Sequence, residues 1–280
     1  MIPAISQACT LNSSFEDDIA GYADAAGSAI EFWLTKLETY LESHSPDEVK
    51  AMGADRGLQF AAASFQGGLL VSQGEARRES WELFERRLGI CAALGVPTLV
   101  VVPDFLGPFG PTDIERAQVS LKQAGQAAER HGIRLALEFQ ARNTFLNNLE
   151  TTVSFIESVQ QPNVGICFDV FHYYMGPSMY EDLRYLTRDN LFHVQFCDVA
   201  DTPREIATDS ERILPGDGDF HLQPLVERFR EIGYEGFVSL EVFNPTFWQV
   251  SARQVGEVGM TAMRMILGQA KGGTASSGRR

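Results

Sequence analysis

The sequence has few of the features by which proteins bind nucleic acids or enter membranes. Its 280 residues include 23 Lys and Arg against 37 Asp and Glu, which gives a formal net charge of −14 at pH 7. A field of this sign repels phosphate backbones, so no nucleic-acid partner is expected. No apolar run approaches membrane-spanning length, so no membrane partner is expected either.

Cysteine is also scarce. The four cysteines form no C-x-x-C pair of the kind that indicates a metal or redox site: Cys9, Cys91, Cys167 and Cys197. Three of them lie in strand-like apolar runs, so we expect buried free thiols in a reducing compartment. The residues from Met1 to Ile5 contain no basic start or signal-peptide core, and the expected location is the cytoplasm.

What the sequence does contain is eight short apolar segments that alternate with helical ones. The apolar segments are 2–10, 29–34, 58–65, 98–102, 133–139, 164–172, 191–198 and 237–243, and helices are predicted at 15–26, from 45, and at 74–94, 111–131, 148–159, 224–232 and 250–267. This alternation indicates parallel strands with crossover connections. An open doubly wound sheet would use the same elements, but no G-x-G-x-x-G follows the first strand.

The count of eight favours a single α/β domain, a (β/α)8 TIM barrel over residues 1–268. The remaining residues, 269–280, form a Gly/Ser-rich segment that we expect to be a disordered tail.

The segment 191–198 places His193 on its inner face, where we expect it to be a buried structural partner of other side chains. Glu31 gives a weaker indication of reaching the barrel mouth.

Acidic residues end three of the later strands. The stretch from Val164 to His172 puts Asp169 on the face opposite Ile166 and Phe168, and the same two-residue period applies to Glu138 and Glu241. In a barrel, the C-terminal ends of different strands converge on one site. A salt bridge would explain each acid singly, but three together repel one another unless a cation neutralises them.

A divalent metal site resolves this conflict, with four oxygen-donating ligands: Glu138, Asp169, Gln195 and Glu241. Such a set suits Mn²⁺ or Mg²⁺, and it would tolerate Co²⁺ or Zn²⁺.

Five stretches resemble the signature blocks of the xylose-isomerase-like TIM-barrel superfamily, the sugar phosphate isomerase/epimerase group: LALEFQ, VGICFDVFHYYMG, LFHVQFCDVAD, RILPGDGDF and GYEGFVSLEVFNP. The resemblance implies the same four metal positions, with His172 near the metal and Arg212 reaching a substrate oxygen. Many members have His where this chain has Gln195. Gln at this position is similar to the hydroxypyruvate isomerase and 3-dehydroshikimate dehydratase branches.

These features predict a metal-dependent isomerase or epimerase of a sugar or keto-polyol that works through an enediolate. Glu138 and Glu241 would move protons on either side of a carbonyl polarised by the metal. His172 would donate to a substrate oxygen or orient a ligand, and both roles stay open. Expulsion of a hydroxyl from the same intermediate would instead make the protein a lyase, dehydrating 3-dehydroshikimate or an inosose.

The expected substrate contacts are Arg212, His172, Trp33 and Phe105. The two aromatic rings, Trp33 and Phe105, lie at or beyond strand ends, where they can stack on a sugar or ring face. The loop 198–209 is expected to cover the site. A DNA-repair endonuclease on this barrel would need more than five histidines and a basic surface, and the intact acid set argues against a sugar-binding protein without catalysis. The oligomeric state stays open, and the aromatic loop after Asn244 would suit a contact in a homo-oligomer.

Overall fold

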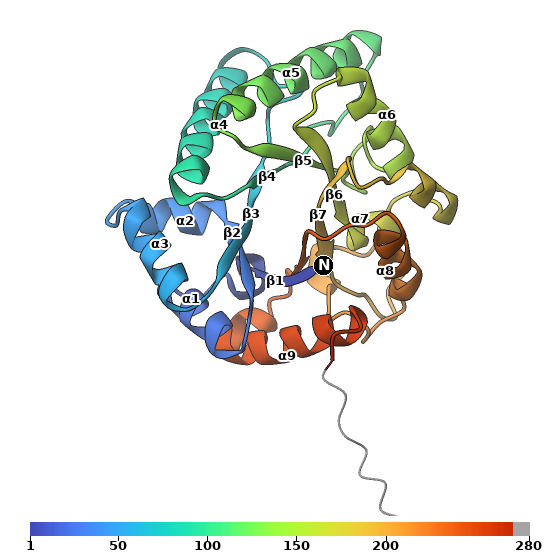
Figure 1. The fold of residues 1–280 in the computed structure, drawn as a ribbon. Helices are drawn as coiled ribbons and strands as arrows, with labels where there is room; N and C mark the ends of the chain where they lie inside the picture. The colour runs from blue at the N-terminus through green and yellow to red at the C-terminus, as the bar shows by residue number, and fades with distance from the viewer. Residues whose placement is uncertain (271–280) are drawn as a thin grey trace, which may run out of the picture.

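The strands of the computed structural model, which describes residues 1–270, form one closed parallel barrel (Figure 1). The barrel closes where β1 pairs with β8, with Ile2 opposite Phe237. The predicted (β/α)8 barrel is therefore confirmed. Its strands are β1 (Ile2–Ser6), β2 (Ala29–Trp33), β3 (Gln59–Gln66), β4 (Thr98–Val101), β5 (Arg134–Glu138), β6 (Val164–Asp169), β7 (Leu191–Phe196) and β8 (Phe237–Leu240).

Helices surround the strands on the outside of the ring (Figure 1). They are α1 (Phe15–Asp24), α2 (Leu34–Leu41), α3 (Pro46–Asp55), α4 (Gly74–Leu94), α5 (Pro111–Arg130), α6 (Leu149–Val159), α7 (Val170–Met175), α8 (Leu222–Glu231) and α9 (Ala252–Ile266). Local sequence explains several of their ends. Ser45 and Glu48 form a capping box at the start of α3, and Gly95 takes the left-handed conformation that ends α4.

Two helices differ from the sequence prediction. The sixth strand ends at Asp169, and Val170, which was predicted to continue it, begins α7. The cause is the Asp169 side chain, which accepts a hydrogen bond from the backbone N–H of Phe171 and caps the helix. Helix α2 was not predicted at all.

The first strand is also shorter than expected, because Gln7–Thr10 forms the 3₁₀ helix η1. Of the predicted tail 269–280, residues 271–280 lie outside the described part.

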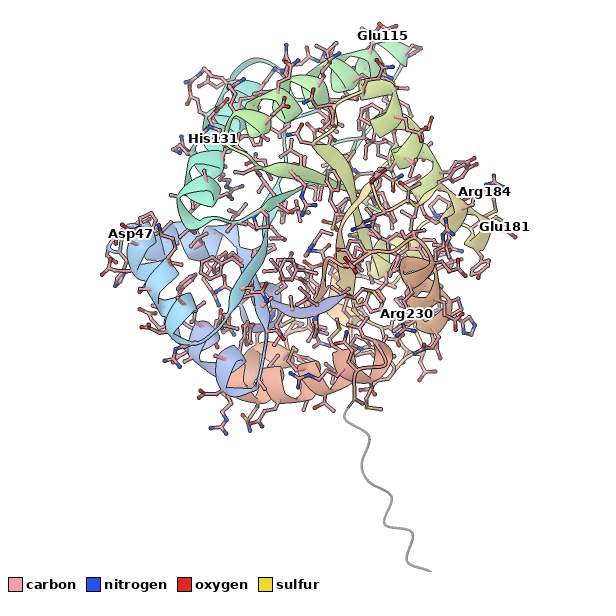
Figure 2. The ribbon with its side chains drawn as sticks, viewed as in Figure 1. Asp47, Glu115, His131, Glu181, Arg184 and Arg230 are labelled. Atoms are coloured by element: carbon pink, nitrogen blue, oxygen red, sulfur yellow. The ribbon has the colours of Figure 1, made fainter. Side chains whose placement is uncertain are left out.

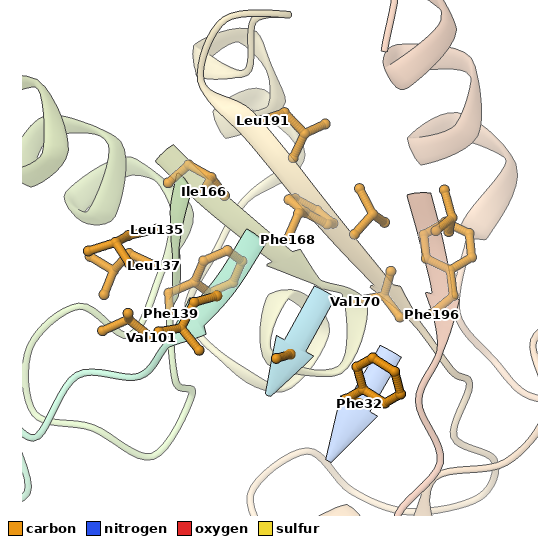
Figure 3. Close-up of a cluster of buried hydrophobic side chains, with 14 of the residues drawn as sticks. Phe32, Val101, Leu135, Leu137, Phe139, Ile166, Phe168, Val170, Leu191 and Phe196 are labelled. Carbon is orange, nitrogen blue, oxygen red and sulfur yellow. The ribbon is translucent and has the colours of Figure 1, made fainter. Parts of the chain in front are cut away.

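The strands separate two kinds of side chain. One set faces the helices and joins the main hydrophobic core, for example Leu135, Leu137, Ile166 and Phe168 (Figure 3). The alternate positions face the inside of the barrel, where a small cluster contains Ala62, Val100, Ala136, Cys167 and Phe192. The polar residues at the C-terminal ends of the strands continue this inner set. The two-residue period therefore carries the acids into the barrel mouth.

The outside of the helix ring carries many charged side chains. Exposed charged or titratable side chains lie on different helices and connecting segments around its edge, as the labelled residues in Figure 2 illustrate: Asp47, Glu115, His131, Glu181, Arg184 and Arg230. Over residues 1–270, none of the helices combines the length and the apolar character needed to cross a membrane.

Helices α1 and α9 pack with their backbones close together, and this contact depends on Gly21. A Cβ atom at position 21 would lie 2.5 Å from the backbone nitrogen of Arg253 and 2.8 Å from the carbonyl carbon of Ala252. We expect Gly21→Ala to lower the free energy of unfolding by about 1–3 kcal/mol, because the helices must move apart. Urea unfolding measures this change.

The same substitution at Gly89 is the matched control. Gly89 is exposed inside α4, and a Cβ atom there would meet nothing within 4 Å. Gly89→Ala should raise the free energy of unfolding by about 0.5–1 kcal/mol, since alanine restricts the unfolded chain. Equal effects of the two substitutions would contradict the close approach of α1 and α9.

Candidate active site

Three carboxylates meet at the C-terminal end of the barrel. Glu138 is the last residue of β5, Asp169 is the last residue of β6, and Glu241 directly follows β8. Their exposed fractions are 5%, 0% and 3%. Like charges at this degree of burial are unfavourable unless cations or hydrogen-bond donors compensate them.

His172 lies between two of these acids. Helix α7 places its Nε2 atom 3.2 Å from Glu138 Oε1 and 3.7 Å from Asp169 Oδ2. Each of the three residues offers one ligand atom, and these atoms all lie within 4.8 Å of one another. The predicted pair of Asp169 and His172 is thus brought together with Glu138, and this group can hold a metal ion.

Arg212 supplies the positive charge in this structure. Its buried guanidinium lies 2.8 Å from Asp169 Oδ2, 3.1 Å from Glu241 Oε2 and 2.6 Å from Asp209 Oδ1. The same group stacks over Phe171, with its carbon 4.4 Å from the ring centroid. Arg212 therefore lies among the acids, as well as lining the cavity above them.

Gln195 is oriented differently from the sequence expectation. Its two N–H groups donate to Glu31 Oε1 and Glu241 Oε1, each at 2.8 Å, and its oxygen accepts the Cys167 thiol at 3.1 Å. The oxygen that was predicted to bind metal is therefore directed at Cys167. The reason is that two carboxylates lie on the other side of the amide, and of the amide's two ends only the nitrogen can donate a hydrogen bond to a carboxylate.

The buried pair of Glu31 and His193 lies beneath this amide. His193 Nε2 is 2.8 Å from Glu31 Oε2 and 3.2 Å from Ser239 Oγ, and both residues of the pair are almost fully buried. His193 occupies the buried position predicted for it. Burial alone would favour the neutral acid, but the charge and hydrogen bond of His193 hold the pKa of Glu31 below its ordinary value.

Asp169 provides the test of whether these residues suit a metal ion. Its Oδ2 atom is buried and, within residues 1–270, forms the ion pair with Arg212 but accepts no hydrogen bond. A buried carboxylate oxygen that accepts no hydrogen bond is unfavourable and can take a further ligand. The oxygen-rich set of Glu138, Asp169 and Glu241, with the His172 nitrogen beside it, fits a hard divalent cation.

A cavity of about 470 Å³ opens above these groups. Its floor is polar and includes Gln140 and Asn143 beside the acids, and its wall is largely apolar: Trp33, Phe65, Val102, Pro103, Leu106 and Phe243. Trp33 lines the cavity as expected of a substrate contact. Phe105 does not line it. The ring of Phe105 is buried against Phe109 and Phe145, at centroid distances of 5.6 and 5.1 Å, because the loop after β4 packs against the loop after β5, where Thr144 donates to the Phe105 carbonyl.

Asp209 is a site residue that the sequence reasoning did not single out. It lies in the 3₁₀ helix η3 (Asp209–Glu211), lines the cavity, and accepts two hydrogen bonds from Arg212. The predicted covering loop 198–209 therefore reaches the site through its last residue. The only feature of the sequence that points to Asp209 is its position three residues before Arg212.

Burial controls the protonation of the central groups. It raises the pKa of Glu138, and it raises the pKa of Glu241 well above its ordinary value although Arg212 opposes the shift. Burial works in the other direction on His172, but the charge of Asp169 and the bond to Glu138 together raise the pKa of His172. Without a metal ion, the site therefore favours bound protons.

The comparisons with known proteins agree with this architecture. The family model described as xylose isomerase-like TIM barrel matches residues 20–264. The chain belongs to this family. Inosose isomerase from Halalkalibacterium halodurans is 28% identical over 255 residues, which cover 89% of this chain and 90% of that protein. The 3-dehydroshikimate dehydratase of Pseudomonas putida is 23% identical, over 91% of this chain but 40% of its own length.

Among solved structures, the IolI protein with a bound zinc atom superposes with a TM-score of 0.89 at 24% identity, covering 98% of this chain and 100% of that one. This likeness confirms the fold, and the match of the family model confirms the family predicted from the sequence. The curated relatives are named as enzymes, an isomerase and a dehydratase, and these are the two reaction classes that the sequence predicted.

The raised pKa values predict how stability depends on pH. A group whose pKa is higher in the folded than in the unfolded protein stabilises the fold below its unfolded pKa, and this contribution is lost as the pH rises through the folded value. Glu138, Glu241 and His172 all have this sign. The metal-free protein should therefore unfold at a lower temperature at pH 8 than at pH 6, as measured by calorimetry.

The double variant Glu138→Gln/Glu241→Gln is the control for this prediction. It removes two of the three groups and should flatten the profile between pH 6 and pH 8. A wild-type profile that is already flat, or that rises with pH, would contradict the protonated state of the site.

Proposed function

We propose that this chain is a divalent-metal-dependent isomerase or epimerase of an uncharged polyhydroxy ketone. The observation that carries the proposal is the buried Oδ2 of Asp169, which accepts no hydrogen bond among the described residues and lies beside Glu138 and His172. The inosose isomerases among the relatives support the substrate class, because an inosose is a ketone that carries only hydroxyl groups.

The carboxylates Glu138, Asp169 and Glu241 would hold the metal ion, and Gln195 is the fourth predicted ligand. A bound Mn²⁺ or Mg²⁺, or Zn²⁺ or Co²⁺ in its place, acts as a Lewis acid that acidifies the C–H bond next to a carbonyl. In this structure the Gln195 oxygen accepts from Cys167 and its N–H groups hold Glu31 and Glu241, so in this orientation Gln195 would support the ligand Glu241 instead of binding the metal itself.

Glu138 and Glu241 are suited to moving the protons. Glu138 accepts a hydrogen bond from Gln140 at 2.7 Å and lies within reach of His172. Burial raises the pKa of both carboxyls, and this brings them closer to the operating pH of a general acid–base pair. They come from β5 and from the end of β8, with β6 and β7 between them, so they can flank a substrate. One would remove a proton and the other return it.

The charge of the cavity favours an uncharged substrate. Arg212 is the one Lys or Arg side chain among the described lining residues, and three carboxylates already surround it. A phosphate or carboxylate on the substrate would meet no further Lys or Arg among these lining residues and would face Asp209 and Glu241. The apolar wall around Trp33 suits the C–H face of a sugar or ring.

Dehydration is the second candidate. Gln195 in place of histidine, and the ending Ser239 to Pro245, resemble the 3-dehydroshikimate dehydratase branch, and such dehydratases are among the relatives. The first proton transfer would be the same. His172 would then protonate the hydroxyl group that leaves.

Proton exchange with solvent is the first test. The Mn²⁺-loaded protein is incubated in D₂O with inososes, ketoses and 3-dehydroshikimate, and the mixtures are followed by proton NMR. We expect deuterium to appear beside the carbonyl of an uncharged ketone, with its carbon skeleton intact. Loss of water would identify the lyase, and no exchange on any of these compounds with metal bound would overturn the proposal.

Glu241→Gln tests the role of that carboxylate. The substitution keeps the volume and removes the proton-accepting group, so turnover should fall by about 10²–10⁴-fold while the circular dichroism spectrum is unchanged. Glu115→Gln, the same change at an exposed position of α5, should leave turnover unaltered. Full activity of Glu241→Gln would exclude Glu241 from the reaction.

A further inference from the structure

Beneath the carboxylates of the mouth, a fourth carboxylate is buried inside the barrel. Glu31 comes from β2 and is 0% exposed. It receives hydrogen-bond donors from two other strands: Ser64 Oγ from β3, and Gln195 Nε2 at 2.8 Å from β7. His193, also on β7, lies 2.8 Å from its second oxygen.

The arrangement around Gln195 uses every polar group of its amide. The amide nitrogen has two N–H groups and two carboxylate partners, Glu31 and Glu241, while the oxygen accepts from Cys167. A turn of the amide by 180° would set its oxygen against the Glu31 carboxylate, which can only accept hydrogen bonds when ionised. Glu31 therefore defines which way the amide points.

Glu241 depends on this amide in turn. Its Oε1 accepts from Gln195 at 2.8 Å and its Oε2 accepts from Arg212 at 3.1 Å, so each oxygen is held by one donor. Arg212 reaches the site from the segment that follows η3, whereas Gln195 belongs to a barrel strand. The strand-borne contact is the more rigid of the two supports.

A buried carboxylate is an unfavourable way to stabilise the fold alone. Replacement of a buried ion pair by apolar side chains of the same volume is often neutral or stabilising. Glu31 and His193 lie one layer below the mouth, away from the cavity lining. Their contacts lead through Gln195 to Glu241.

We propose that Glu31 is a positioning residue of this site: paired with His193, it fixes the direction of the Gln195 amide and, through that amide, the position of the Glu241 carboxylate. The importance of Glu241 rests on the proposed function, but the fixed amide does not. The two are therefore tested separately.

The first experiment needs neither metal nor substrate. The full-length metal-free protein is labelled with ¹⁵N-glutamine, and the Gln195 side-chain signal is assigned by its loss in Gln195→Met. In the wild-type protein its N–H protons should exchange with D₂O at least about a hundredfold more slowly than those of exposed glutamines, because both donate inside the barrel. Exchange as fast as that of an exposed glutamine would overturn the proposal, whether or not any variant folds.

Glu31→Met then removes the acceptor at nearly constant volume. We expect the Gln195 amide protons to exchange at least about tenfold faster in this variant, since one of them has lost its carboxylate. An unchanged exchange rate in a folded Glu31→Met protein would show that Glu31 does not fix the amide.

The second experiment measures Mn²⁺ binding by calorimetry. Substitution of residues that orient metal ligands typically weakens binding about 10–100-fold, and Glu31→Met should fall in this range. Asp18→Asn is the control, because Asp18 is an equally buried carboxylate that binds Lys36 at 2.6 Å, outside the site. It should lower the melting temperature without changing the affinity for Mn²⁺.

The outcomes separate the two proposals. If wild-type protein binds neither Mn²⁺ nor another divalent ion, the proposed function fails, while the amide exchange still decides the role of Glu31. If wild-type protein binds Mn²⁺ and Glu31→Met binds it equally well, or if Asp18→Asn weakens binding as much, the positioning role is wrong.

Discussion

Negative charge gathered in a place with little water is the constraint on which this structure depends. Three nearly buried carboxylates meet at the mouth of the barrel and a fourth lies below them. Each has an identifiable compensation: Arg212 for Asp169 and Glu241, His172 for Glu138, and His193 for Glu31. One oxygen, Oδ2 of Asp169, is left without a hydrogen bond among the described residues. The proposed metal ion would be bound at that point.

The barrel makes this concentration of charge possible. Each strand presents apolar side chains to the helices on alternate positions, so the main core is complete without any contribution from the inner face. The inner face is then free to carry small residues below and polar residues above, as Ala136 and Glu138 illustrate on β5. The main hydrophobic core, which lies between the strands and the helices, offsets the free-energy cost of burying the acids.

Much of this could be predicted from the sequence because it follows from period and order. Alternation of apolar segments with helices gives the barrel, and the two-residue period puts Glu138, Asp169 and Glu241 on its inner face. Helix α7 could not be seen in the same way. Val170 continues the apolar alternation of β6, and only the cap formed by Asp169 ends the strand before it.

The missed features depend on contacts between distant residues. The direction of the Gln195 amide is set by Glu31, which is 164 residues away in the chain, and no local pattern contains that information. The burial of Phe105 against Phe145 and the approach of Arg212, with Asp209 beside it, to Asp169 and Glu241 both depend on the paths of long loops. Strand periodicity predicts where a side chain points, but it does not predict what a loop brings to meet it.

The closure of the barrel has a consequence for how the chain is made. The pairing that closes the barrel joins Ile2 to Phe237, so β1 waits for a partner that is synthesised after all the other strands of the barrel. Until β8 emerges, the sheet is open and both β1 and β7 present unpaired edges, which are the surfaces through which chains aggregate. Closure between such distant segments is also slow. The barrel is therefore most exposed to misassembly in the period before β8 pairs with β1.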